Sequence, residues 1–196
     1  MNFGYEPVSG EEITPCIPEL SHLRISIFRE YPYLYDGDLD YESQYLSRYT
    51  KSSRSLVVLM KHRGAIVGAT TCLPLEDEIN EFREPFERAG YDVKDIFYFG
   101  ESIILPEFRG QGAGKAFFRF REDHAARGGD FKYTTFCAVD RPEDHPERPA
   151  NYRPLSQFWE RMGYQKSTAL RCELPWKEVG SSGEIPHQLT FWIKTH

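Results

Sequence analysis

The sequence predicts a single α/β domain in which helices flank a mixed β-sheet. Two aliphatic runs, residues 55–61 and 65–73, are separated by a short His-Arg-Gly turn, which is typical of a β-hairpin. Strand-like runs at 96–105 and 131–139 are joined by a glycine turn and a helix-like run at 115–127, which predicts a right-handed parallel unit. The 196 residues are enough for one full core and few for two.

The remaining stretches complete this domain in order. Residues 1–15 are polar and irregular, and predict a loosely held arm. Outside the hairpin and the parallel unit, apolar residues recur at helical spacing in several segments, and two more strand-like runs lie near the end of the chain. The expected further helices span 19–31, 42–49, 78–89 and 155–162, and the expected closing strands span 169–174 and 188–195. No linker divides 1–196.

Composition narrows the class of protein. The formal net charge of −6 argues against a general nucleic-acid binder, which needs a basic face. No run approaches the ~20 apolar residues of a membrane span, and the N-terminus has no signal-peptide pattern. The four cysteines lie far apart, so we expect reduced thiols in a cytoplasmic protein. No zinc or calcium ligand spacing occurs, so we expect no metal.

A glycine-rich stretch at 106–115 lies between the strand-like and helix-like runs of the parallel unit. Its glycines leave the backbone uncovered, and the start of the helix adds free N–H groups and a partial positive charge. Together with the flanking cations, these groups predict a diphosphate site rather than an ordinary strand-to-helix turn. The predicted contacts are Arg109, Gly110, Gln111, Gly112, Ala113, Gly114 and Lys115.

Two common phosphate loops are excluded by spacing. A Walker loop needs glycine where Arg109 stands and Ser or Thr where Ala116 stands. A dinucleotide fingerprint needs a third glycine three residues beyond the second, where this chain has Lys115 or Phe117. Neither loop fits.

The pattern that remains is Arg-x-x-Gly-x-Gly, at Arg109, Gly112 and Gly114. It resembles the coenzyme A loop of the GCN5-related N-acetyltransferases. Residues 104–106 resemble the end of that family's fourth strand, and residues 158–164 resemble its second signature, a helix ending in Gly-aromatic. The resemblance covers roughly residues 55–175. It implies a mostly antiparallel central sheet, with acetyl-coenzyme A as co-substrate.

The resemblance also assigns roles on the strand at 96–105. Gly100 inside a strand predicts a bulge, which in this family lies at the active site and frees backbone groups for the pantetheine arm. The amides near Ile103 and Leu105 could supply the oxyanion donor. The remaining predicted cofactor contacts are Ile104 and Phe158.

In the family that it resembles, an amine attacks the thioester directly, so a base must take a proton from the amine. Glu101 is the leading candidate, and the lesser candidates are Tyr98, Asp140 and His145. The alternative for Glu101 is an exposed strand carboxylate or an ion pair with Arg109. Trp159 occupies the position where many members have a proton-donating tyrosine. Because an indole cannot serve as the acid, Tyr152 and Tyr164 are the remaining candidates.

The loop at 140–154 is charged and contains four prolines, and predicts a wall of the acceptor site. Its arginines suit an acceptor carboxylate, while Asp140 and Glu101 suit an acceptor amine. The predicted acceptor residues are Asp140, Arg141, His145, Arg148, Tyr152, Arg153 and Trp159.

The sequence therefore predicts an N-acetyltransferase that acts on a primary amine of a small or amino-acid-like acceptor. Two alternatives remain open. One is an acyl-coenzyme A sensor or interaction module with reduced catalysis, which Trp159 favours. The other is a protein N-acetyltransferase. The expected partners are acetyl-coenzyme A and a small amine, without nucleic acid or membrane, and a homodimer is possible.

Overall fold

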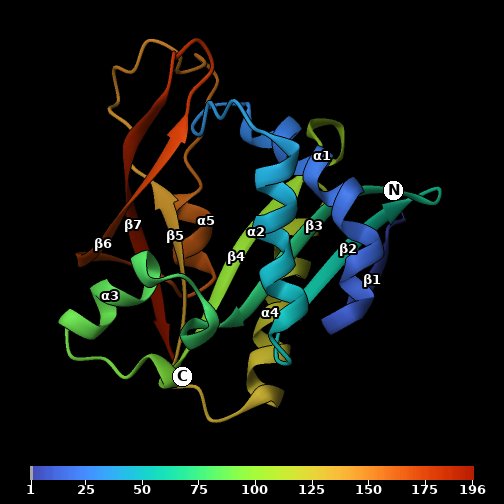
Figure 1. Cartoon of the computed structure of the whole chain (residues 1–196), viewed down its shortest axis with the longest axis vertical. Helices are drawn as coiled ribbons and strands as arrows, with labels where there is room; N and C mark the ends of the chain where they lie inside the picture. Colours follow the sequence, from blue (N-terminus) through green and yellow to red (C-terminus); the bar gives the residue numbers. More distant parts are fainter. Residues whose placement is uncertain (1) are drawn as a thin grey trace.

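The computed structural model describes residues 2–196 and contains a seven-stranded sheet with helices on both faces (Figure 1). The strand order is β1-β2-β3-β4-β5-β7-β6, and every neighbouring pair is antiparallel except β4 and β5. The prediction of a mixed, mostly antiparallel sheet with one parallel strand–helix–strand unit is confirmed. The strands are β1 (Gly4–Val8), β2 (Leu56–His62), β3 (Ala65–Pro74), β4 (Ile96–Ile104), β5 (Tyr133–Val139), β6 (Gln165–Lys177) and β7 (Glu184–Thr195).

Helices cover the two faces of the sheet unequally (Figure 1). On one face, apolar residues of three helices join a core cluster with β2, β3 and β4; these are α1 (Ile17–Phe28), α2 (Leu39–Lys51) and α3 (Asn80–Arg88). The other face packs against α4 (Ala113–Gly128) and α5 (Ser156–Arg161) through a cluster rich in aromatic rings. Leu20 and Leu46 on the first face and Phe118 on the second are buried, as the helical periodicity requires.

The N-terminal segment is ordered, so the prediction of a loosely held arm over residues 1–15 is wrong where the structure describes it; Met1 lies outside the described residues. Gly4–Val8 pairs with β2 along its whole length, and a 3-10 helix follows at Gly10–Cys16. Ile13 is fully buried. Backbone pairing with β2 holds the strand at the edge of the sheet, and the buried Val8 and Ile13 anchor the segment in the core.

The predicted bulge in β4 is present. Thr70 pairs with Ser102 and Cys72 with Phe99, so two residues, Gly100 and Glu101, lie opposite Thr71 alone. A Cβ at Gly100 would collide with the hydroxyl groups of Tyr49 and Thr71, which explains why only glycine fits there. The extra residue turns the Glu101 side chain toward α1 and α2, where it meets Arg24 and Tyr45.

β4 and β5 pair over only a short length. The parallel register joins Ile96–Tyr98 to Tyr133–Thr135 and then stops. Beyond that point β5 stays paired with β7 as far as Val139, while β4 stays paired with β3 as far as Ile104. The sheet therefore opens between two strands that run in the same direction.

None of the helices within residues 2–196 is long and apolar enough to cross a lipid bilayer.

Candidate active site

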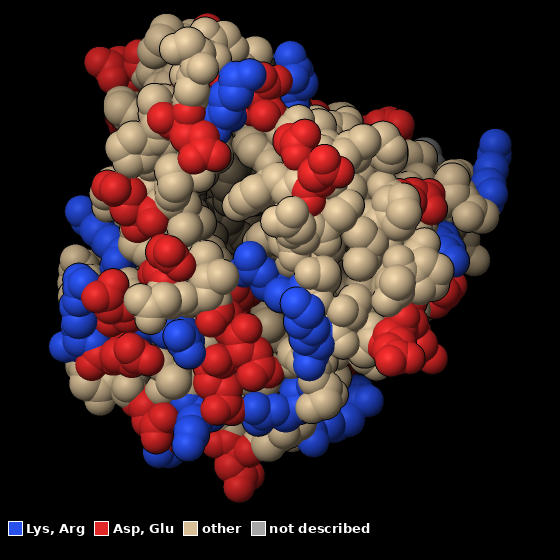
Figure 2. All heavy atoms as spheres, viewed as in Figure 1, with Lys and Arg blue, Asp and Glu red and all other residues tan. Residues whose placement is uncertain are grey.

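A cleft of about 2060 Å³ lies where β4 and β5 separate. Its hollow is visible in the space-filling view (Figure 2). The glycine loop lines one part of the cleft, and residues of α1 and α2 line another. The exposed edges of β4 and β5, the helix α5 and the loop 140–154 complete the wall. The cleft thus brings together segments from most of the chain.

The glycine loop has the backbone conformation that the sequence indicates. Gly110 and Gly112 have φ of 76° and 89°, in the left-handed region that favours glycine, and Gly112 is the N-cap of α4. Gly114 lies against Phe158, because a Cβ there would come within 3.3 Å of the Phe158 ring. The residues of the loop that line the cleft are Arg109, Gly110, Gly112, Ala113, Gly114 and Lys115.

Gln111 is not part of the cleft wall; its amide donates to the Glu107 carbonyl at 3.4 Å. Arg109 braces the loop: its Nε donates to the Ile104 carbonyl at 2.8 Å, and a terminal nitrogen pairs with Glu30 at 2.8 Å. The alternative ion pair between Arg109 and Glu101 is therefore not formed. The guanidinium holds the end of β4 to the loop that follows it.

The free edge of β4 contributes Ser102, Ile103 and Ile104 to the cleft. Leu105 does not line it, and its N–H donates to the Val67 carbonyl at 2.9 Å. The structure thus contradicts the prediction that the Leu105 amide is free to bind an oxyanion, because β3 already uses that group. Phe158, on α5, lines the cleft directly opposite the start of α4.

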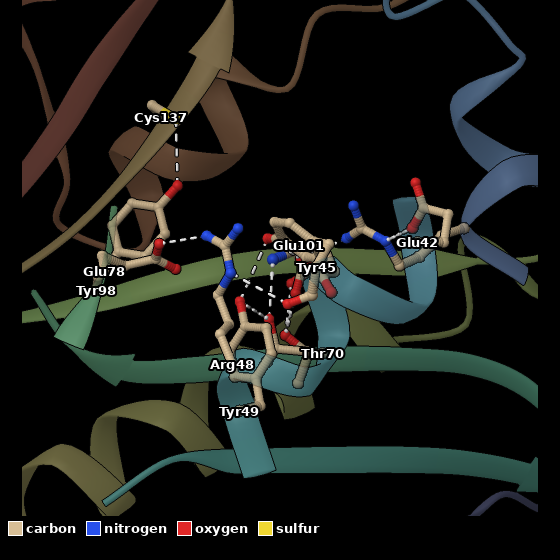
Figure 3. Close-up of polar contacts among 12 residues, drawn as sticks. Glu42, Tyr45, Arg48, Tyr49, Thr70, Glu78, Tyr98, Glu101 and Cys137 are labelled. Carbon is tan, nitrogen blue, oxygen red and sulfur yellow. Dashed lines mark hydrogen bonds and ion pairs between the residues drawn. The ribbon is translucent and has the colours of Figure 1, made fainter. Parts of the chain in front are cut away.

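Glu101 lies at the bulge and is buried, with 7% of its surface exposed. Its Oε2 accepts from Arg24 at 2.7 Å and from the Tyr45 hydroxyl at 3.0 Å (Figure 3). Arg24 also pairs with the fully buried Glu42, so one guanidinium holds two carboxylates. The Oε1 of Glu101 has no hydrogen-bond partner among residues 2–196, which leaves one oxygen for a proton or a ligand.

Tyrosines and a second ion pair extend this polar cluster along α2 (Figure 3). The Tyr45 and Tyr49 hydroxyls lie 3.4 Å apart, and Arg48 pairs with the buried Glu78 at 2.7 Å. Burial raises the pKa of Tyr45, and the nearby Glu101 raises it further, so this hydroxyl stays protonated and donates. Burial also raises the pKa of Glu78, although Arg48 opposes the change.

Arg24 is charged in spite of its position. Burial alone would lower its pKa, but Glu101, Tyr45 and Glu42 together raise the pKa well above the ordinary value. Its guanidinium also stacks over the Tyr45 ring at 4.0 Å. Arg24 is therefore the centre of the buried charges on this side of the cleft.

Sequence reasoning missed four members of this cluster: Arg24, Glu42, Arg48 and Glu78. A signal was present for the first two. Arg24 lies one turn after the buried Leu20, and Glu42 lies one turn before the buried Leu46, so each places a charge on an apolar helix face. Opposite charges on the buried faces of neighbouring helices indicate a paired interior site.

The two tyrosines proposed for catalysis differ in position. Tyr98 lines the cleft; its hydroxyl is 3.3 Å from Cys137 Sγ, and burial raises its pKa. Tyr164 does not line the cleft and is only 1% exposed. Its hydroxyl contacts Thr134 at 2.8 Å and donates to Glu122 at 3.3 Å. The structure contradicts a role for Tyr164 as the acid, because its hydroxyl is held inside the aromatic core.

The first residues of the loop 140–154 are held by the protein itself. Asp140 accepts from Lys166 at 3.1 Å and also from Thr190. Arg141 donates to the carbonyls of Pro32 and Tyr33 at 2.6 and 3.0 Å, and pairs with Glu178. Both line the cleft, but these contacts fasten the loop rather than present free charges.

Of the remaining predicted acceptor residues, some line the cleft and one does not. His145 does not line the cleft; its Nδ1 accepts from the Glu147 N–H at 3.2 Å. Arg148 lines the cleft, donates to the Glu143 carbonyl at 3.2 Å and lies over the Tyr152 ring. Tyr152, Arg153 and Trp159 also line the cleft, and Trp159 packs against Phe136 and Trp192.

The acetyltransferase (GNAT) family model matches residues 19–150, well over half of the chain. The protein therefore belongs to this family and is a GNAT-type acyltransferase, as the glycine loop and the second signature predicted. No curated protein sequence matches it. Among residues 2–196 no group of three His, Cys, Asp or Glu side chains could hold a metal ion.

Solved structures share the fold at low identity. One is yncA of Salmonella typhimurium with its cofactor acetyl-CoA, with a TM-score of 0.60, 12% identity, and coverage of 100% of this chain and 94% of that one. The ribosomal-protein-alanine N-acetyltransferase of Brucella melitensis has a TM-score of 0.61, 13% identity, and coverage of 98% and 99%. NAA60 of Arabidopsis thaliana, in complex with a bisubstrate analogue, has a TM-score of 0.62, 10% identity, and coverage of 100% and 99%.

Proposed function

We propose that the protein transfers the acetyl group of acetyl-CoA to the primary amine of a small, amino-acid-like acceptor. The observation that carries this proposal is the continuous cleft, which runs from the glycine loop to the bulge at Glu101. Family membership and the acetyl-CoA complex of the Salmonella relative support the donor. The left-handed Gly110 and Gly112 leave room at the start of α4, which fits a diphosphate.

Each part of the cleft has a role in this proposal. The amides of Gly112, Ala113 and Gly114 and the Lys115 side chain hold the diphosphate, while the Lys115 amide donates to the Gly112 carbonyl at 3.1 Å. The free edge of β4 at Ile103 and Ile104 holds the pantetheine arm. Phe158 packs beside them. The Oε1 of Glu101 accepts the proton of the acceptor amine, directly or through water, while Arg24 and Tyr45 hold the other oxygen.

The departing group needs no strong acid in this scheme. Tyr164 lies in the core and Trp159 has no acidic proton, so neither protonates the sulfur. Tyr98 is near the bulge, but its hydroxyl faces Cys137. A thiol has a pKa of about 8.5, so the thiolate can leave and take its proton from solvent.

Contacts across the cleft favour a small acceptor over a protein chain. The Tyr31 and Tyr152 rings meet at 4.7 Å, and Arg141 binds the carbonyls of Pro32 and Tyr33. The connection between α1 and α2 is thus joined to the loop 140–154. These contacts narrow the acceptor side, and Arg153 in the cleft wall suits the carboxylate of an amino-acid-like acceptor.

The test has two parts. Calorimetry with CoA and acetyl-CoA measures donor binding, and release of free thiol from acetyl-CoA against a panel of amines and amino acids measures transfer. We expect micromolar donor binding and turnover with at least one small amine. Donor binding without turnover on small amines, but with turnover on peptide N-termini, would replace the small acceptor with a protein. Tight binding with no turnover on either class would instead favour the sensor.

A further inference from the structure

Among the residues that the structure describes, Arg121 is a buried cation without a counter-ion. It lies on α4, is 2% exposed and lines the cleft. Its guanidinium stacks over the rings of Phe99 at 4.4 Å and Phe118 at 4.7 Å. Its Nε is buried without a hydrogen-bond partner in residues 2–196. The neighbouring carboxylate, Glu122, is turned away and pairs with Lys194 at 2.8 Å.

Such an arrangement is unfavourable in the free protein. A buried charge is normally paired and hydrogen-bonded, and aromatic contacts compensate only part of the lost hydration. Burial lowers the pKa of Arg121, which is the expected direction for a cation held in this way. The other buried arginine of the cleft, Arg24, holds two carboxylates. Arg121 therefore has unused capacity for an anion that enters the cleft.

The position of Arg121 shows which anion that can be. Phe99 is the last residue of β4 before the bulge, and Phe118 packs against Phe136 of β5 at 5.8 Å, just beyond the last paired residue. Arg121 thus lies where the two strands separate. It is eight residues into α4 from Ala113, about 12 Å along the helix axis, so it lies roughly two turns beyond the amides proposed to hold the diphosphate.

We propose that Arg121 binds the terminal carboxylate of a dicarboxylic acyl group, so that the enzyme accepts malonyl- or succinyl-CoA as well as acetyl-CoA. This inference rests on the proposed function, since it assigns the acyl end of the donor to the point where β4 and β5 separate. A planar guanidinium matches a carboxylate through two parallel hydrogen bonds, and the surrounding aromatic rings exclude competing water.

The reaction is the same acyl transfer with a different acyl group. The amine nitrogen forms a bond to the thioester carbon, the carbon–sulfur bond breaks, and CoA leaves as the thiolate. The amine loses one proton to Glu101, and the thiolate takes one from solvent. The second carboxylate of the acyl group is unchanged, and Arg121 only holds it.

The test compares donors by calorimetry, which requires no acceptor. CoA, acetyl-CoA, malonyl-CoA and succinyl-CoA are titrated into the wild-type protein and into Arg121→Met, Arg121→Lys and Arg119→Met. Arg119 is an exposed arginine on the same helix and serves as the matched control. Because hydrogen bonds to charged groups contribute roughly 10- to 100-fold in binding, we expect one dicarboxylic donor to bind about 10-fold or more tightly than acetyl-CoA.

Arg121→Met should remove that preference while leaving CoA binding within about threefold, and Arg121→Lys should retain part of it. Arg119→Met should behave like the wild-type protein. Equal binding of acetyl and dicarboxylic donors by the wild-type protein overturns the inference, as does an equal loss of all four ligands in Arg121→Met. Failure of the proposed function looks different: either CoA itself does not bind, or the donors bind and the thiol-release assay detects no transfer to any amine.

Discussion

The two halves of the cleft are built by different means. The donor half, made of the glycine loop, the start of α4 and the edge of β4, presents backbone groups. The acceptor half, made of α1, α2 and the loop 140–154, presents side chains that hold one another in place. A backbone site is specified by the few residues that set its dihedral angles. A side-chain site is specified by pairs distant in sequence, such as Arg24 with Glu42 and Tyr45 with Glu101.

The difference also concerns stability. The charges at the centre of the acceptor half, Arg24, Glu42 and Glu101, are all nearly inaccessible to solvent. The corresponding ion pair in the donor half, Arg109 with Glu30, is 43% exposed on both sides. Removing one partner of a buried ion pair strongly destabilises the fold, whereas an exposed ion pair contributes little to the free energy of unfolding. Substitutions in the acceptor half should therefore mainly lower the free energy of unfolding, and substitutions in the donor half should mainly lower the affinity for CoA.

The largest expected effect is that of Arg24→Met. It leaves Glu42 and Glu101 buried without a cation, so the free energy of unfolding should decrease by about 3–5 kcal/mol. Urea denaturation followed by circular dichroism measures this change. The control is Arg29→Met, since the pair of Arg29 with Asp36 is exposed to solvent and should contribute little to stability. Equal losses in the two variants would contradict the proposed difference between the halves.

The next effect concerns Glu101→Gln, in the acceptor half. The amide can still accept from Tyr45 but cannot take a proton, so kcat should fall by roughly 10²-fold or more with the amine that the panel identifies. The affinity for CoA should stay within about twofold, because the donor half is untouched. Glu81→Gln changes an exposed carboxylate in the wall of the same cleft and should leave kcat unchanged. A kcat for Glu101→Gln within threefold of wild type would exclude the base role.

A smaller effect is expected for Gly112→Val in the donor half. The left-handed φ of 89° is strained for a β-branched residue, so the loop should shift and the affinity for CoA should fall roughly 10- to 100-fold. Gly180→Val is the matched control: its φ is 85°, and a Cβ added at either glycine would have no neighbour within 4 Å. Both variants should lose similar stability, and only Gly112→Val should lose calorimetric affinity for CoA. If both keep the affinity, the glycine loop is not the diphosphate site.

The same contrast explains what the sequence could predict. The glycine loop, the bulge at Gly100 and the parallel unit were all predicted, because each follows from a short local pattern. The polar cluster was found only in part, through Glu101. Arg24 of α1 forms an ion pair with Glu101 of β4, which is distant from it in the sequence. No local sequence pattern can indicate such a contact.

Two errors have the same cause. The N-terminal strand β1 was missed because its five residues contain no aliphatic run, although backbone hydrogen bonds hold it to β2. Tyr164 was proposed as an acid because it is the last residue of the second signature, but its side chain turns into the core beside Thr134. In both cases the sequence pattern does not contain the packing. Only the folded structure shows that β1 pairs with β2 and that the Tyr164 side chain is buried.

The smallest expected effect is a pH dependence at His187, which packs behind Trp176, a residue of the cleft wall. His187 is buried, its ring stacks on Trp176 at 3.6 Å, and its Nε2 has no hydrogen-bond partner among residues 2–196. Burial lowers its pKa and Arg141 lowers it further, while Glu178 opposes this. The unfolded chain, with an ordinary histidine pKa of about 6.5, therefore binds a proton more readily than the folded protein does.

The sign of the effect follows from this difference. The stabilising contribution is present above pH 6.5 and is lost as the pH falls through the lower pKa of the folded state, so the free energy of unfolding should decrease between about pH 7 and 5.5. His187→Phe keeps an aromatic ring against Trp176 and removes the titration, so its slope should be shallower; His196, whose pKa is also lowered, keeps a residual slope. Urea denaturation at half-unit pH steps measures both slopes. Identical slopes would show that His187 is already accessible to protons in the folded protein, and that the packing between His187 and Trp176 is looser than the structure indicates.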